Sequence, residues 1–146
     1  MELTSEQRDF FSRHHGAAMT TLRADGTPHM VRVGCVLIGN VLWSSGTRER
    51  LRTRNLRRDP RATVMVFNSR GGYLTAEARV RLLEGDEVPE LSVRLFRRMN
   101  HMDNAPPDAP IRFGDREMTP DELCQFMVDD QRLIYEFEPG RVYGSM

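Results

Sequence analysis

The dipeptide Gly39-Asn40 constrains the fold of this 146-residue sequence more than any other single feature. Before it, residues 29–38 read HMVRVGCVLI and are rich in β-branched side chains. After it, residues 41–45 read VLWSS. Two such segments joined by a two-residue turn of this type form an antiparallel hairpin. The sequence therefore predicts antiparallel β-structure in its first third.

Further periodic segments surround this hairpin. We expect strands over residues 17–22, 62–67, 73–83, 133–137 and 141–143, and helices over 4–14, 48–58, 88–99 and a segment that opens at Thr119-Pro120. Residues 100–118 contain NAPPDAP and are expected to form a loop. This order predicts a mainly β, α+β fold, in which six or seven antiparallel strands form a barrel with flanking helices. Trp43 is expected to pack inside that barrel.

Size and composition favour one cytoplasmic domain over residues 1–146. The chain is 39% hydrophobic and 29% charged, as in folded globular proteins. No segment approaches the ~18 apolar residues that span a membrane, and the polar start MELTSEQRDFF does not resemble a signal peptide. Cys35 and Cys124 have neither metal-binding nor redox spacing, which suits free thiols in a reducing compartment. We expect no membrane partner.

The segment 44–61, SSGTRERLRTRNLRRDPR, concentrates positive charge in a chain whose net charge is zero. It holds seven of the 21 basic side chains, all of which are arginine, so a lysine Schiff base is excluded. A helix that begins after Thr47 presents unpaired N–H groups and the positive end of its dipole. Arg50 and Arg52 add planar guanidinium groups near the first turn.

The residues that precede this helix strengthen the same interpretation. Ser44, Ser45 and Thr47 supply hydroxyl groups, and Gly46 allows a ligand to approach the backbone closely. Together with the arginines they predict a site for phosphate or another anion. Two alternatives remain open. In the first alternative, the segment is an arginine-rich helix that only faces solvent. In the second it binds nucleic acid, which the zero net charge and the lack of clustered aromatic residues disfavour. We therefore expect no nucleic-acid partner.

Three segments of the chain resemble the pyridoxamine 5′-phosphate oxidase-like superfamily of flavin-binding split barrels. Within it, they resemble the actinobacterial branch that uses flavin or the deazaflavin coenzyme F420. The segments are MTTLRADGTPHMVRVG (19–34), TRERLRTRNLRRDPRATVMV (47–66) and MVDDQRLIYEFEPGRVYG (127–144). The resemblance implies a split β-barrel that forms a homodimer, with two cofactor sites at the subunit interface.

The same resemblance implies the residues that hold the cofactor. The phosphate is expected at the strand-to-helix junction, held by Ser45, Thr47, Arg50 and Arg52, with Ser44 and Asn55 as further candidates. The strand after Asp-Gly-Thr-Pro is expected to line the ring with the side chains or backbone of His29, Met30, Val31, Arg32 and Val33. Only every second side chain of a strand faces one side, and the sequence leaves open which set faces the ring.

The expected activity follows from this resemblance. We expect an F420-dependent oxidoreductase that transfers a hydride from the reduced cofactor to an electron-poor acceptor, such as an enone, a quinone or a tetrapyrrole-like system. Seven arginines exceed what the single phosphate of FMN needs, which favours F420. The alternatives are an FMN-dependent oxidoreductase and a non-catalytic flavin- or F420-binding protein. Because the cofactor carries the hydride, we expect neither a catalytic side chain nor a metal ligand.

Overall fold

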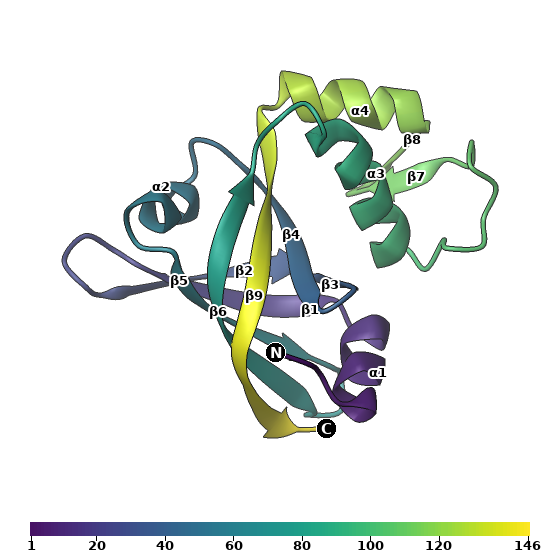
Figure 1. Ribbon diagram of the computed structural model, residues 1–146. Helices are drawn as coiled ribbons and strands as arrows, with labels where there is room; N and C mark the ends of the chain where they lie inside the picture. The colour runs from purple at the N-terminus through teal and green to yellow at the C-terminus, as the bar shows by residue number, and fades with distance from the viewer.

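A single antiparallel sheet of seven strands dominates the computed structural model, which describes residues 1–146 (Figure 1). Its order is β2-β1-β5-β6-β9-β4-β3. The strands are β1 (Gly16–Leu22), β2 (Pro28–Gly34), β3 (Val36–Ile38), β4 (Val41–Thr47), β5 (Arg61–Phe67), β6 (Tyr73–Leu83) and β9 (Arg132–Ser145). A separate small hairpin pairs β7 (Ile111–Phe113) with β8 (Arg116–Met118).

The sheet curves around a core of 18 buried residues, as a barrel does. Alternation along the strands assigns the side chains to its two faces: in β1, Ala17 and Met19 are fully buried while Ala18 and Thr20 are partly exposed. Two helices complete this core. Phe10 and Phe11 come from α1 (Ser5–Arg13), and Leu56 comes from α2 (Leu51–Arg58). Both helices therefore close the barrel by burying their apolar side chains among the inward-facing residues of the strands.

A second core lies on the outer side of β3 and β4. It joins Val36, Ile38 and Trp43 to α3 (Val88–Met99), α4 (Pro120–Asp129) and the β7–β8 hairpin. Figure 1 shows these later elements gathered together at the upper right of the molecule, opposite α2. Trp43 thus packs outside the barrel rather than inside it, because Leu42 takes the inward position of that strand.

Most expected elements are present, with shifted ends. The expected helix over 48–58 begins only at Leu51, because Arg50 has an extended backbone. The expected strand over 29–38 is divided at Cys35 into β2 and β3, and the two expected C-terminal strands form one long strand, β9. The expected loop 100–118 includes the β7–β8 hairpin. The fold is thus the expected mainly β arrangement with flanking helices.

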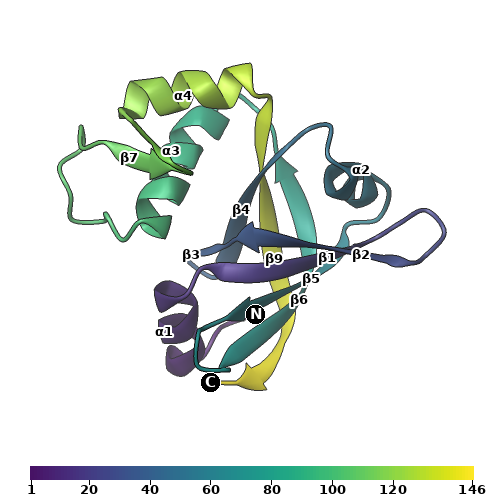
Figure 2. The ribbon, with the colours of Figure 1, turned by 180° about the vertical axis from the view of Figure 1, so that it is seen from behind.

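Strand β9 holds the sheet together because it pairs with β6 along most of its length and with β4 at its start. A bulge at Gly140 shifts its register against β6 between Glu77 and Ala78. Seen from behind, β1 and β2 form a hairpin whose tip extends well beyond the sheet (Figure 2). No helix of the structure combines the length and the apolar character needed to cross a membrane.

Candidate anion site at the junction of β4 and α2

The N-terminus of α2 differs from those of α1 and α4 in having no cap. Thr4 and Thr119 close the starts of α1 and α4 with full capping boxes, as the spacing of Thr4 and Gln7 predicts. At α2, Arg50 occupies the N-cap position and its side chain makes no capping hydrogen bond. The backbone N–H groups of Leu51 and Arg52 therefore have no hydrogen-bond partner, and they lie at the positive end of the helix dipole.

Arg52 is the only arginine of segment 44–61 that is buried, with 8% of its surface exposed. Its guanidinium carbon lies 5.5 Å from the ring centroid of Tyr135. Its Nε has no hydrogen-bond partner, and it takes part in none of the salt bridges. Burial lowers the pKa of this guanidinium, and the charges of Arg50 and Arg132 lower it too. A buried cation without a counter-ion fits a site that receives an anion.

A buried hydrogen-bonded chain fixes the first turn of α2. The Thr53 hydroxyl donates to the carbonyl of Thr47 at 2.6 Å and lies 2.5 Å from the Tyr135 hydroxyl. The ring of Tyr135 packs directly on Gly46, where an added Cβ would lie 2.2 Å from the phenol oxygen. The sequence suggested that Gly46 makes room for a ligand. In the structure Gly46 makes room for Tyr135.

The three hydroxyl residues of β4 do not share one face. Ser44 points into the barrel beside Tyr135, is buried, and its hydroxyl has no partner. Ser45 and Thr47 lie on the outer face, where Thr47 stands opposite Arg132 in the register. The expected hydroxyl residues therefore divide between the two faces of the strand end, Ser44 on the inner side and Ser45 and Thr47 on the outer side, and Arg52 lies over the ring of Tyr135.

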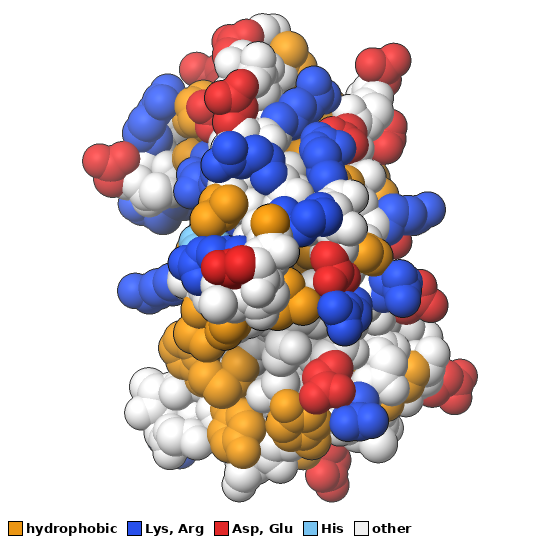
Figure 3. All heavy atoms as spheres, turned by 90° about the vertical axis from the view of Figure 1, so that its left-hand side faces the viewer, with side chains coloured by type: hydrophobic (Ala, Val, Ile, Leu, Met, Phe, Trp, Pro, Cys, Tyr) orange, Lys and Arg blue, Asp and Glu red, His pale blue; other side chains and the backbone are white.

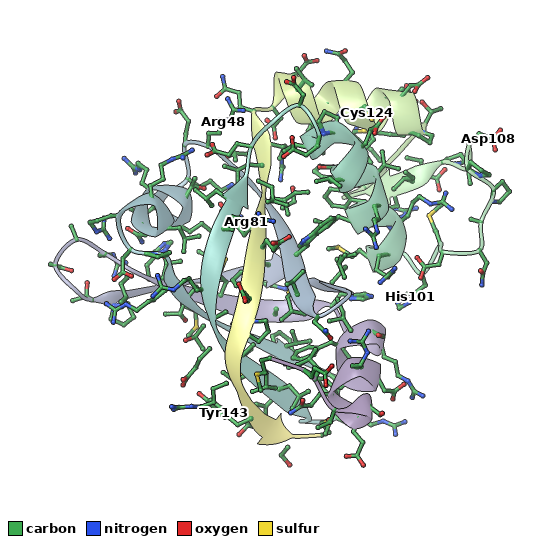
Figure 4. All side chains as sticks on the ribbon, in the orientation of Figure 1. Arg48, Arg81, His101, Asp108, Cys124 and Tyr143 are labelled. Atoms are coloured by element: carbon green, nitrogen blue, oxygen red, sulfur yellow. The ribbon has the colours of Figure 1, made fainter.

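Four of the seven arginines have structural partners. Arg57 forms a two-pronged contact with Glu84 at 2.6 and 2.9 Å, and Arg48 bonds to the carbonyl of the same residue at 3.2 Å. Arg58 bonds to the carbonyl of Leu22, and Arg61 pairs with Asp59. Figure 4 shows Arg48 in the upper part of the molecule, between α2 and α4.

The remaining three arginines are Arg50, Arg52 and Arg54. The side chains of Arg50 and Arg54 are exposed and make neither a hydrogen bond nor a salt bridge. Only three guanidinium groups are thus free for a ligand. The surplus of positive charge in the segment is smaller than the sequence suggests.

Asn55 is buried and already engaged. Its amide donates to the hydroxyl of Thr21 at 3.0 Å, and its carbonyl oxygen accepts from Arg58 at 3.2 Å. These contacts hold α2 against the end of β1. Asn55 therefore positions α2 on the barrel.

The residues of β2 lie on two faces. Val31 and Val33 pack against the barrel core, and His29 shares their side of the strand. The Nδ1 atom of His29 is buried and has no hydrogen-bond partner. Met30 and Arg32 point outward and are exposed. A ring on the outer face of β2 would meet these two side chains and the strand backbone.

The sequence does not predict that Tyr135 and Arg132 lie at the junction. Both belong to β9, far from the arginine segment in sequence, and reach the junction only because β9 pairs with β4. No local motif identifies them. The one signal in the sequence is that both residues lie in the segment 127–144, which carries part of the family resemblance.

The surface around the junction is strongly basic. Viewed from the side of α2 and the β1–β2 hairpin, basic side chains gather in the upper half and an apolar patch occupies the lower half (Figure 3). An open groove of about 680 Å³ lies on the outer face of β1, β5, β6 and β9. Leu22 and Arg61, which flank the C-terminal end of α2, form one part of its lining.

Comparison with known proteins places these features in a family. The chain is 27% identical, over 98% of its own length and 88% of the relative's, to an F420H(2)-dependent biliverdin reductase of Mycobacterium tuberculosis. Its fold matches the structure of an F420 reductase with a TM-score of 0.69 and 19% identity, covering 97% of this chain and 98% of the other. A conserved hypothetical protein from Mycobacterium tuberculosis matches with a TM-score of 0.71 and 19% identity, over 99% and 85% of the two chains.

A family model also matches most of the chain. Residues 3–119 match the family described as pyridoxamine 5′-phosphate oxidase. This range includes the β1–β2 hairpin, the junction of β4 and α2, and strands β5 and β6. The chain therefore belongs to the pyridoxamine 5′-phosphate oxidase-like family of split barrels.

Proposed function

We propose that this protein is an F420-dependent oxidoreductase that transfers a hydride from the reduced deazaflavin to an electron-poor small molecule. The observation that carries the proposal is Arg52, a buried guanidinium without a counter-ion at the uncapped start of α2. An anionic arm placed there would supply the missing charge. The relatives named for F420 support the choice of cofactor.

Each residue at the junction would contribute to cofactor binding in a different way. Arg52 and the free N–H groups of α2 would hold the phosphodiester, and Arg50 would approach it from the solvent side. Ser45 and Thr47 offer hydroxyl groups on the outer face of β4. The unpartnered hydroxyl of Ser44 is a further donor on the inner side. Asn55 would fix the helix that carries these groups.

The ring would lie along the outer face of β2. There, Val31 and Val33 would contribute backbone atoms, because their side chains pack in the barrel core. His29 lies on the same side of the strand as Val31 and Val33, so it too would contribute backbone atoms. The side chains of Met30 and Arg32 would face the ring. The deazaflavin supplies the hydride chemistry when bound. The chain itself would bind, orient and exclude water, so its lack of a nucleophile motif agrees with this role.

The proposal includes a homodimer with the cofactor at the subunit interface. It is supported by a row of residues on the outer face of the sheet, Ala18, Met65, Thr75 and Tyr143, which the strand registers place side by side. None of the four belongs to either core. Tyr143 is 45% exposed and projects from β9 on the side away from α1 and α3 (Figure 4). A second copy would cover this apolar face.

An FMN-dependent oxidoreductase is the main alternative. Because four arginines of segment 44–61 are engaged in the fold, three free guanidinium groups no longer exceed what one phosphate with its N–H donors can use. The preference for F420 therefore rests on the relatives more than on charge. A non-catalytic carrier of flavin or F420 would use the same binding site and differ only in turnover.

Fluorescence titration of the purified protein with F420 and with FMN tests the proposal. We expect a dissociation constant below ~100 μM for F420, equivalent to about 5.5 kcal/mol, and a weaker one for FMN. Binding of neither cofactor in this range would remove the proposal. Tighter binding of FMN would select the alternative cofactor.

A second assay separates an enzyme from a carrier. Reduced F420 is mixed with the protein and with an enone, a quinone or a linear tetrapyrrole, and its reoxidation is followed by absorbance. We expect at least one acceptor to reoxidise the cofactor faster than it does without protein. Tight binding with background rates for all three classes would indicate a carrier.

A further inference from the structure

Arg132 lies beside the proposed anion site but comes from the opposite end of the chain. It is the first residue of β9 and stands opposite Thr47 in the register. Its Nη1 lies 3.5 Å from the hydroxyl of Ser45. Only 13% of its side chain is exposed. Arg132 thus faces the same side of the strand end as the two hydroxyl residues that are expected to bind the cofactor phosphate.

The contacts of Arg132 leave part of its guanidinium available. Its Nε donates to Asp130 at 2.8 Å, and its guanidinium carbon lies 5.1 Å from the ring centroid of Phe113. The carboxylate engages one edge of the group and the ring covers a face. The Nη atoms have only the long contact to Ser45. A second acceptor can therefore bind the Nη atoms, and a bidentate contact that also uses Nε requires the Asp130 carboxylate to leave.

The charge balance of this corner is incomplete. Thr47 connects two of its arginines: it stands opposite Arg132 in the register, and its carbonyl accepts from the backbone N–H of Arg50 at 3.4 Å. The charges of Arg50 and Arg132 also help to lower the pKa of Arg52, after its burial. Among the salt bridges of the protein, only the one to Asp130 neutralises any of the three. Asp130 is itself 42% exposed. Three cations with one exposed carboxylate form a site that an added anion stabilises.

We propose that Arg132 is a further ligand of the cofactor's anionic arm, and that the arm competes with Asp130 for its guanidinium. This inference rests on the proposed function. It adds a residue from outside the arginine segment, and it makes Asp130 an internal competitor of the ligand. A bidentate guanidinium contact to phosphate replaces, wholly or in part, the contact to the carboxylate.

The contacts of Arg132 connect the β7–β8 hairpin and the end of α4 to the proposed anion site. Phe113 belongs to the β7–β8 hairpin, and Asp130 directly follows α4. Both restrict where the guanidinium of Arg132 lies. The elements of the second core therefore help to set the affinity for the anionic arm, although the arginine segment makes no part of that core.

The test compares phosphorylated and unphosphorylated ligands. Wild-type protein, Arg132→Met and Asp130→Asn are titrated with FMN and riboflavin, and with F420 and its deazaflavin chromophore lacking the phosphodiester arm. We expect Arg132→Met to weaken binding of FMN and F420 roughly 10-fold or more, with no change for the unphosphorylated forms. We expect Asp130→Asn to tighten binding of FMN and F420 severalfold, because the competing carboxylate is gone.

Arg116→Met is the matched control. Arg116 also lies over an aromatic ring, that of Phe126 at 5.7 Å, but it is exposed and away from β4. This variant is expected to bind all four ligands as the wild type does. Should Arg132→Met fail to fold, Arg132→Lys and Asp130→Asn decide the question, since both keep a cation at position 132.

The outcomes separate the two proposals. Wild-type protein that binds F420 or FMN, with Arg132→Met within twofold of it, would overturn the role of Arg132 and leave the proposed function intact. Equal losses for phosphorylated and unphosphorylated ligands would also overturn it, because they indicate a structural effect. Weaker binding in Asp130→Asn would contradict the competition. Wild-type protein that binds neither cofactor would remove both proposals.

Discussion

The phenol of Tyr135 occupies the space where a side chain at position 46 would begin. An added Cβ on Gly46 would lie 2.2 Å from the phenol oxygen and 2.4 Å from a ring carbon. The same phenol bonds to Thr53 and lies beneath Arg52. One pair of residues in β4 and β9 therefore determines how the first turn of α2 sits on the barrel.

Gly46→Ala is expected to destabilise the protein by about 1–3 kcal/mol, because the ring of a fully buried tyrosine has no space to move. Chemical denaturation followed by circular dichroism measures this change. Tyr135→Phe in the same background is expected to give little rescue, since the ring carbon remains in place. Full rescue would mean that the phenol oxygen alone causes the clash.

Arg52→Met is expected to weaken cofactor binding without lowering the stability of the protein. Loss of one charge-assisted contact to the cofactor weakens binding by roughly 10- to 150-fold. The melting temperature without cofactor is expected to stay level or rise, because the variant removes a buried charge without a counter-ion. Arg54→Met, at an exposed position of the same helix, is the control for both measurements. A lower melting temperature with unchanged affinity would assign Arg52 a purely structural role.

Glu84 is expected to make the attachment of α2 depend on pH. The hydrogen bond from Arg57 lowers the pKa of this carboxyl from its ordinary value of 4.5. A group with a depressed folded-state pKa contributes stability above its unfolded pKa, and that contribution is lost as the pH falls through the folded value. The stability difference between wild type and Glu84→Gln is thus expected at pH 7 and should vanish below pH 4.5.

Thermal melts of both proteins between pH 7 and pH 3 measure this difference. Glu90→Gln is a suitable control, since Glu90 is exposed and has no ion-pair partner. A stability difference between wild type and Glu84→Gln that stays constant down to pH 3 would indicate that it does not arise from the charge of Glu84 alone.

Met65→Glu is expected to convert the proposed dimer to a monomer. Met65 lies on the outer face of β5, in register with Ala18 and Thr75. A charge at this position would have to be buried in the interface at a large cost. Sedimentation velocity measures the oligomeric state. Val128→Glu is the control, because Val128 is 59% exposed on α4, away from this face. A wild-type monomer would refute the dimer directly.

The two cysteines are expected to differ in reactivity. Burial raises the pKa of the Cys35 thiol to about 12, so the reactive thiolate is scarce at neutral pH. Cys124 is partly exposed. A colorimetric thiol assay should detect one reactive group in the native protein and two after unfolding. Equal rates for both thiols in the native state would mean that the β2–β3 junction opens readily.

Local sequence patterns predicted the strands and helices well, because burial in this fold follows simple periodicity. The strand 73–83 and the helix 88–99 have the expected bounds. Errors arose where the chain breaks a pattern. Cys35 interrupts an apolar run that reads as one strand, and the proline-rich segment 100–118 contains a hairpin of two three-residue strands.

The candidate site was only partly predictable, for a different reason. Arg52 and Thr47 belong to one contiguous segment, so the sequence could group them. Tyr135 and Arg132 enter through strand pairing between β4 and β9, which no local pattern encodes. The sequence also could not tell which arginines pair within the fold, because Glu84 and Asp59 select their partners in space.

The two apolar cores meet back to back across β4, where Leu42 faces one and Trp43 faces the other. Neighbouring residues of one strand therefore pack in separate cores. Substitutions among the residues of α3 and α4 can accumulate without disturbing the packing inside the barrel. The inner side of the sheet and the helices outside it can therefore be altered one at a time, since β4 contributes adjacent buried residues to each of them from its two faces.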